Sequence, residues 1–201
     1  MRKRPAFSRF LVVFLFSTLL FLFTPQNLKA QATPAAARKG EISVFGGYAK
    51  VWPDYGPFTN HGATFGVDYI HYTHWFVNPS VEFRVKVTSG GGTVDENTWG
   101  GGARFEREIK YFHPYADFLI SKGTIHYNFQ NPTNPHPTGT PYTSDNSIVY
   151  SPGLGVDFDV TYHLAARVDY QWEFWNLGNN QTLTPKALTI GVLFRIPFHA
   201  F

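Results

Sequence analysis

The sequence predicts an all-β protein, an eight-stranded antiparallel up-and-down transmembrane β-barrel. Apolar and polar residues alternate with a period of two along most of the chain, which is typical of strands with two unlike faces. The apolar face carries bulky side chains, whereas the polar face mixes glycine with charges of both signs. Aromatic residues, 18% of the chain, gather near the ends of the alternating segments. After Glu41 no stretch of ten residues shows helical periodicity.

The N-terminal segment has the parts of a cleavable signal peptide. Four basic residues precede or flank the start of the apolar run Phe10–Phe23, which is shorter than the roughly 20 residues of a spanning helix and therefore disfavours an uncleaved anchor. Ala30-Gln31-Ala32 fits a signal-peptidase site, and Leu28-Lys29-Ala30 is a second option. We expect residues 1–32 to be a signal peptide, 33–40 a short N-terminal lead and 41–201 the barrel domain.

The charge of the chain changes when this peptide is set aside. The whole chain has 17 basic and 14 acidic residues, a net charge of +3. The peptide holds five of the basic residues and no acid, so the remaining chain has 12 against 14, a net charge of −2. A nucleic-acid partner is therefore not expected. Without cysteine, neither a disulfide framework nor a lipidated cysteine is available.

The alternating segments divide into eight strands separated by clusters of Gly, Pro and Asn. In the third segment, for example, valine and phenylalanine alternate with Glu82, Arg84 and Lys86. The eight expected strands are Ile42–Val51, Ala63–His74, Val81–Thr88, Thr98–Ile109, Tyr115–Phe129, Ile148–Tyr162, Ala165–Asn176 and Ala187–Phe198.

The connections between the expected strands alternate in length. After the second, fourth and sixth strands they are tight (WFVNPS, KYFHP and HL). After the other strands they are longer and polar or proline-rich (WPDYGPFTNHG, SGGGTVDEN, QNPTNPHPTGTPYTSDNS and LGNNQTLTP). Outer-membrane barrels have short periplasmic turns and long extracellular loops. We therefore expect a protein of the bacterial outer membrane with both chain termini in the periplasm.

Charged residues on the polar strand faces form the candidate site. A water-soluble barrel would turn charges outward, with Lys and Glu dominant, whereas Gly and Asp dominate this face. Glycine leaves room for paired Arg and carboxylate side chains in a narrow interior. The expected lumen charge network consists of Asp68, Glu82, Arg84, Lys86, Arg104, Glu106, Asp117, Asp157, Asp159, Arg167, Asp169, Glu173 and Arg195.

Aromatic residues near the strand ends predict two belts at the membrane interfaces. By the short turns lie Trp75, Phe76, Tyr111, Phe112, Tyr115, Tyr162 and Phe198. Nearer the long loops lie Trp52, Trp99, Tyr127, Phe129, Tyr150, Trp172 and Phe174. Belts that bracket an apolar band indicate that the apolar face meets lipid and the polar face lines the lumen.

The chain after the signal peptide resembles the small OmpA-like outer-membrane β-barrel family. The resemblance rests on SVFGGYAKV, ATFGVDYIHY, HPYADFLIS, GLGVDFDVTYHLAARVDYQW and GVLFRIPF, and it covers essentially the whole of that chain. It implies insertion by the barrel-assembly machinery, which reads the last strand. Phe194, Ile196 and Phe198 match that assembly signal, but the chain continues as HAF, so Phe201 is a second option for the terminal aromatic.

A search for catalytic residues finds no pattern that predicts an enzyme. Some barrels of this kind remodel lipid A, and the deacylase type uses a His-x-Ser-Asn element. The nearest match, His126-Tyr127-Asn128, has no serine. Asp157 and Asp159 share a face and could act as acid and base, but ion pairing with arginine is the simpler interpretation. We expect no catalytic, cofactor-binding or metal-binding residues.

The sequence leaves three functions open. The first is a structural, envelope-integrity or surface-interaction role through extracellular loops, with a lumen largely plugged by charged residues. The alternative is a porin-like conduit for ions or very small solutes, and the third is a lipid A-modifying enzyme. Expected partners are outer-membrane lipid and lipopolysaccharide, the barrel-assembly machinery during insertion, and an extracellular ligand at the loops.

Overall fold

The computed structural model describes residues 38–54, 58–89, 94–127, 144–177 and 182–199. The expected signal peptide and the aromatic residues Phe129 and Phe201 lie outside this part of the chain. The described strands are β1 (Arg38–Trp52), β2 (Asn60–His71), β3 (Asn78–Ser89), β4 (Val94–Glu106), β5 (Phe112–Tyr127), β6 (Ser144–Asp159), β7 (Leu164–Trp172), β8 (Phe174–Asn176), β9 (Thr182–Leu183) and β10 (Lys186–His199). The described residues form no helix long and apolar enough to span a membrane.

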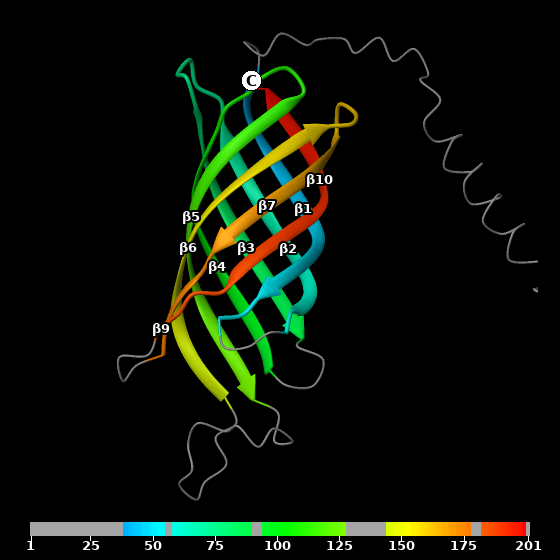
Figure 1. The fold of residues 1–201 in the computed structure, drawn as a ribbon. Helices are drawn as coiled ribbons and strands as arrows, with labels where there is room; N and C mark the ends of the chain where they lie inside the picture. The colour runs from blue at the N-terminus through cyan, green and yellow to red at the C-terminus, as the bar shows by residue number, and fades with distance from the viewer. Residues whose placement is uncertain (1–37, 55–57, 90–93, 128–143, 178–181, 200–201) are drawn as a thin grey trace, which may run out of the picture. The chain divides into compact units, whose positions relative to one another are not determined.

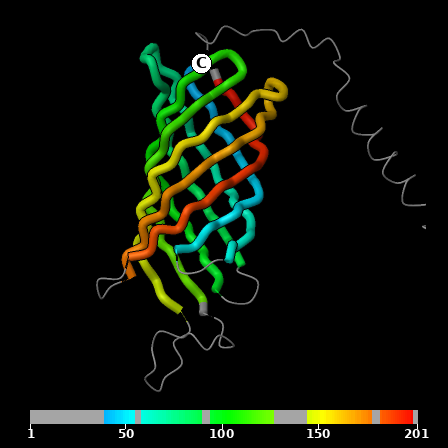
Figure 2. The backbone as a smooth tube through the Cα atoms, viewed as in Figure 1, coloured from blue at the N-terminus to red at the C-terminus, as the bar shows by residue number. Residues whose placement is uncertain are grey.

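The strands form a closed, eight-stranded, all-antiparallel β-barrel, as the sequence predicts (Figures 1 and 2). Each long strand pairs with its neighbour in the chain, and β7 pairs with β10. The ring closes where β1 pairs with β10 from Arg38↔His199 to Trp52↔Lys186. Closure leaves the long strands no unpaired edge, which is the condition for crossing hydrocarbon with strands.

The seventh expected strand, Ala165–Asn176, is divided in the structure. β7 ends at Trp172, which pairs with Lys186 of β10, whereas β8 pairs with β6 and with the two-residue β9. Between β7 and β8 the Glu173 amide donates a hydrogen bond to the carbonyl oxygen of Pro185 at 2.9 Å. The short strands β8 and β9 therefore extend the sheet beyond the point at which β10 begins.

The two ends of the barrel differ less in connection length than the sequence predicts. The connections at residues 72–77, 107–111 and 160–163 lie at the end where β1 begins and β10 ends, which we call the turn end. At the opposite loop end, β3 runs to Ser89 and β4 begins at Val94, so that connection covers 90–93 rather than the nine residues expected. Strand pairing extends into the predicted loop because Ser89 pairs with His61 of β2 and Val94 pairs with Tyr127 of β5.

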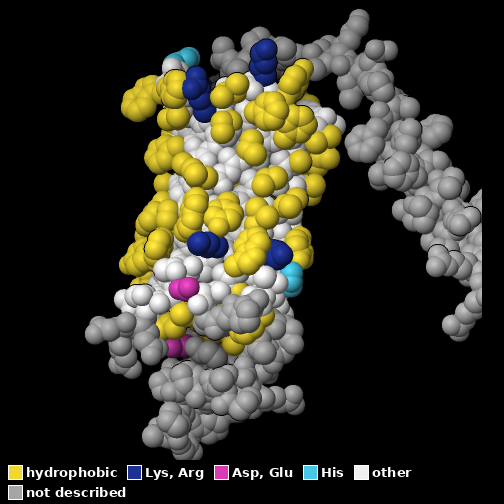
Figure 3. Space-filling view, viewed as in Figure 1, with side chains coloured by type: hydrophobic (Ala, Val, Ile, Leu, Met, Phe, Trp, Pro, Cys, Tyr) yellow, Lys and Arg dark blue, Asp and Glu magenta, His cyan; other side chains and the backbone are white. Residues whose placement is uncertain are grey.

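Side chains alternate strictly between the interior and the outer face. Along β3 the pattern of buried and exposed residues changes at nearly every position, with Val81, Phe83 and Val87 exposed and Glu82 and Arg84 buried. Hydrophobic side chains cover much of the visible outer face, with Lys and Arg side chains near its ends (Figure 3). The outer face is therefore apolar over its central band and the interior is polar.

Candidate functional site: the charge network in the barrel interior

The structure places all thirteen residues of the predicted network on the inward face. Twelve of them are buried, and the side chain of Asp159 is 25% exposed. Twelve of them lie on seven of the eight long strands, all except β1, and Glu173 lies between β7 and β8. Because inward positions recur at every second residue, one strand can place two or three charges in the interior, as β3 does with Glu82, Arg84 and Lys86.

Two arginines and two aspartates form the centre of the network. Asp157 accepts hydrogen bonds from Arg167 Nε at 2.8 Å and from Arg104 Nη2 at 2.6 Å. Asp68 Oδ2 accepts from the same two guanidinium groups, at 2.7 Å from Arg167 and 3.0 Å from Arg104. All four side chains are at most 1% exposed. Removal of one member would leave its partners as buried charges without full compensation.

Arg84 organises a second group of carboxylates. Its Nη1 donates to Asp169 at 2.6 Å, and its guanidinium also contacts Glu82 at 2.5 Å and Asp117 at 3.3 Å. Gln171 Nε2 donates to both oxygens of Asp117 at 2.9 Å. Arg84 and Asp169 are separated by 85 positions in the sequence, so their pairing links opposite parts of the chain across the interior.

Two inward aromatic rings support these arginines. The Arg104 guanidinium lies 3.6 Å from the ring centre of Tyr115, and that of Arg167 lies 4.2 Å from the ring centre of Phe45. The Tyr115 hydroxyl also donates to Asp169 at 2.8 Å. The prediction that Tyr115 belongs to an interface belt is wrong, because it is 4% exposed and shares its inward phase on β5 with Asp117.

At the turn end, acidic and basic groups surround His113. Its two ring nitrogens lie 3.1 Å from Glu106 and 2.9 Å from Asp159, which also pairs with Arg195 at 2.6 Å. Arg195 lies 3.3 Å from Glu41.

The hydroxyl of Tyr72, in the turn after β2, donates to the other oxygen of Glu41 at 3.0 Å. Burial raises the pKa of the Tyr72 hydroxyl well above its usual range, so it remains a donor. Sequence analysis missed Glu41, His113 and the buried Glu96. Each lies one or two residues before an expected strand, whereas the observed strands β1, β4 and β5 begin earlier and place all three on the inward face.

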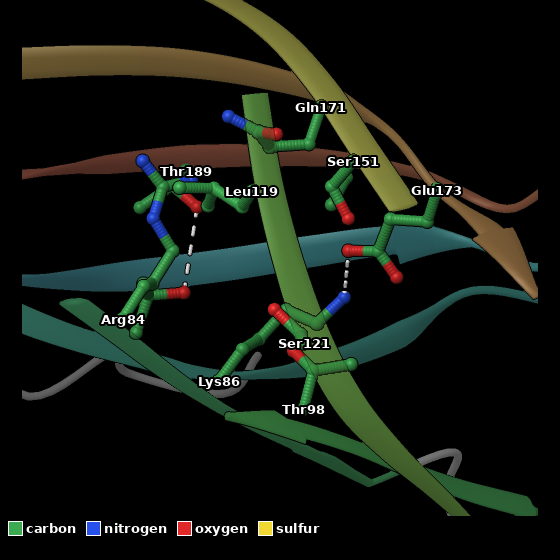
Figure 4. Close-up of a pocket in the computed structure, with 11 residues that line it drawn as sticks. Arg84, Lys86, Thr98, Leu119, Ser121, Ser151, Gln171, Glu173 and Thr189 are labelled. Carbon is green, nitrogen blue, oxygen red and sulfur yellow. Dashed lines mark hydrogen bonds and ion pairs between the residues drawn. The ribbon is translucent and has the colours of Figure 1, made fainter. Parts of the chain in front are cut away.

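Toward the loop end the interior changes character. Lys86 forms an ion pair with Glu173, which also accepts a hydrogen bond from Trp175 Nε1 at 3.1 Å. Next to this pair lies a cavity of about 10 Å³, roughly the size of one water. It is lined by hydroxyl groups and by Arg84, Lys86 and Glu173 (Figure 4). The hydroxyl-bearing residues in its wall are Thr64, Thr98, Ser121, Ser151 and Thr189.

Beyond the ion pair the interior holds an apolar cluster beside the buried Glu96. Val94, Ile125, Val149 and Trp175 form a buried cluster, against which Leu177 and Leu183 pack. This apolar cap was not expected, because the alternation predicts an inward face made of polar residues. It lies where β8 and β9 extend the sheet, and its members are inward by phase like the charges nearer the turn end.

Carboxylates outnumber cations among the described interior residues. Five arginine or lysine side chains face ten carboxylates, with His113 as a further base. The described interior therefore holds more acidic than basic side chains. Within the described ranges, no group of three or more His, Asp or Glu side chains could hold a metal ion.

The described residues of the predicted assembly signal lie on the last strand, β10. Phe194 and Ile196 face outward and are each 50% exposed. The Phe198 ring stacks on Tyr69 of β2 with 6.0 Å between ring centres. Because Phe201 lies outside the described residues, which aromatic residue the assembly machinery reads stays a prediction.

Comparison with known proteins shows the fold. No protein-family model matches the chain, and no curated protein matches its sequence. Neisserial surface protein A is 15% identical, with a TM-score of 0.52 over 80% of this chain and 97% of that chain. Ail, the attachment invasion locus protein of Yersinia pestis, is 17% identical, with a TM-score of 0.50 over 79% of this chain and 99% of that chain. The outer membrane enzyme PagL is more distant, at 10% identity and a TM-score of 0.42. The chain thus has the fold of small outer-membrane barrels.

Proposed function

We propose that the protein is an integral barrel of the bacterial outer membrane with a structural, envelope-integrity or surface-interaction role. The inverted polarity of the barrel carries this proposal. Val81 and Ile190 on the outer face are 64% and 55% exposed, whereas Arg104 and Arg167 in the interior are buried. Such an outer face is unfavourable in water, whereas lipid solvates it and the closed strands satisfy the backbone groups.

Membrane fractionation tests the proposed location. The full-length protein should stay with the membrane after urea or alkaline extraction, and it should migrate faster on SDS gels unboiled than boiled. Recovery in the soluble periplasmic fraction would contradict the proposal. Antibody labelling of an epitope placed in 72–77 tests orientation, because we propose that the turn end and both chain termini are periplasmic. The epitope should be labelled only in permeabilised cells, and labelling on intact cells would contradict this orientation.

The charge network supports a plugged lumen. Arg104 and Arg167 at its centre each contact carboxylates from several strands. Neither side chain can move out of the lumen without leaving buried carboxylates unpaired. We expect near-silent planar-bilayer recordings from the unmodified protein. Arg167→Ala should add conductance, since it deletes a side chain that joins β7 to β2 and β6. Large, steady channels from the unmodified protein would refute the plug.

A porin-like conduit is the second candidate, and the hydroxyl-lined cavity favours it. One ion pair, Lys86 with Glu173, lies between this cavity and the apolar cap. In this case the unmodified protein should already conduct ions, and Lys86→Gln should raise that conductance. The path should be selective for cations because carboxylates outnumber bases, and the reversal potential in a salt gradient measures this.

We propose a surface rather than a catalytic role. His126 lies exposed on β5, Asn128 is outside the described residues, and Asp157 is fully engaged by arginines. The name of the similar Ail refers to attachment and invasion, which supports a test of surface interactions. We propose that an extracellular ligand binds at the loop end of the barrel. An unchanged lipid A mass spectrum after overexpression would agree with this role, whereas a new lipid A species would contradict it.

A further inference from the structure

A groove on the outer wall of the barrel crosses β4, β5 and β6 near the loop end. It has a volume of about 440 Å³ and is walled by the exposed side chains of Trp99, Ile120 and Ile148. Lys122 and Asn146 complete its lining on the outer face. None of these residues belongs to the interior charge network.

Cross-strand rows explain why the groove is there. Trp99, Lys122 and Ile148 are direct partners in one row across the three strands. In the next row toward the turn end, Gly101 pairs with Ile120, which pairs with Tyr150. The groove lies between these two rows, where Trp99 and Ile148 of one row and Ile120 of the other form its walls. The groove is therefore a gap in the lipid-facing surface between large side chains.

The polarity of these rows changes across the groove. The row on the loop side is polar, with Asn97, Thr124 and Asn146 as partners, and the Thr124 hydroxyl donates to Asn146 Oδ1 at 2.8 Å. That bond uses the amide oxygen of Asn146 and leaves its NH₂ group as a donor. Rows on the turn side are apolar, and Phe118 and Tyr150 stack there with 6.4 Å between ring centres.

Lys122 lies where these polar and apolar rows meet. It forms no ion pair, hydrogen bond or cation–π contact with any described residue, whereas the outward Lys50 lies over the Trp52 ring at 5.1 Å. The interior cations all have carboxylate partners. An uncompensated ammonium beside an apolar groove complements an amphiphile with a negative head and a hydrocarbon tail.

We propose that this groove binds one anionic membrane lipid. The hydrocarbon chain lies against Trp99, Ile120 and Ile148, and the phosphate of the headgroup contacts the Lys122 ammonium and the Asn146 amide. This inference rests on the proposed membrane location. It goes further than that location, because it predicts that one lipid binds preferentially at one place on the outer face. A barrel without such a site would contact lipids equally around its circumference.

Native mass spectrometry of the detergent-solubilised full-length protein tests the site. The probes are phosphatidylglycerol and phosphatidylcholine with the same acyl chains. We expect one phosphatidylglycerol to be retained in preference to phosphatidylcholine, and Lys122→Gln to lower its retention about fivefold. Ile148→Trp, which fills the groove, should reduce retention of both lipids.

Lys186→Gln is the matched control. Lys186 also faces outward near the loop end and pairs with a tryptophan, Trp172, but it does not line the groove. Its replacement should leave retention unchanged. Equal losses in the Lys122 and Lys186 variants, or equal retention of the two lipids by the unmodified protein, would overturn the groove. Failure of the proposed location is distinguishable, because then the unmodified protein would show no heat-dependent shift on SDS gels.

Discussion

The two halves of the barrel interior are filled in different ways. From the turn end to the middle, arginines and carboxylates fill the space, with Arg104 and Arg167 shared between Asp68 and Asp157. At the loop end, Trp175 and three aliphatic residues form an apolar cluster beside the buried Glu96, and one ion pair, Lys86 with Glu173, lies between the two regions. Both regions are buried and both project from inward strand positions.

The difference shows that the inward face of a barrel need not have one chemistry. In the charged half, each polar group needs a partner in fixed geometry, so the fit depends on side chains from several strands. In the apolar half, burial itself is favourable and the fit is less directional. We expect the charged half to be more sensitive to single substitutions, and the predictions below test that difference.

The largest effect should follow from Arg167→Ala in the charged half. It leaves Asp68 and Asp157 buried with only part of their compensation, which should lower the free energy of unfolding by about 3–5 kcal/mol. Urea unfolding in lipid vesicles measures the change. Lys186→Ala on the outer surface is the control and should cost about 0–1 kcal/mol. A loss for Arg167→Ala as small as that of the control would contradict a stabilising network.

Trp175→Ala tests the apolar half. Truncation of a buried tryptophan should cost about 3 kcal/mol, because the cavity among Ile125 and Val149 cannot fully collapse. Trp172→Ala is the control, since that side chain is three positions away on the outer face and 36% exposed. The same unfolding assay applies. A larger loss for Trp175→Ala than for Arg167→Ala would reverse the comparison between the halves.

The smallest effect should come from Tyr115→Phe. The ring beside Arg104 remains, and only the hydrogen bond to Asp169 is lost, while Arg84 still pairs with that carboxylate. We expect a loss of about 1 kcal/mol in unfolding free energy. Tyr48→Phe, at an exposed position on the outer face, should change stability less. If Tyr115→Phe costs as much as Arg167→Ala, the hydroxyl rather than the arginine centre limits the network.

Sequence alternation by itself determined the strands and their faces. A period of two assigns every residue of a strand to one of two sides, so the inward placement of Asp68, Arg104 and Arg167 followed without knowledge of their neighbours. The rule did not reach Glu41 and His113, because both lie just before the expected starts of their strands. Strand ends were less accurate, because pairing extended β3 and β4 into a segment that its glycines and polar residues marked as a loop.

Tertiary structure decided which inward residues meet. Arg84 pairs with Asp169, and Arg104 with Asp157, because the register and closure of the eight strands bring each pair to the same height along the barrel axis. Alternation within one strand carries no information about that height. Tertiary structure also decided that the Tyr115 ring contacts the Arg104 guanidinium, that an apolar cluster forms near the loop end, and that Trp99, Ile120 and Ile148 wall a groove on the outer face. Sequence determines the side to which a residue points, whereas packing across the barrel determines what it meets there.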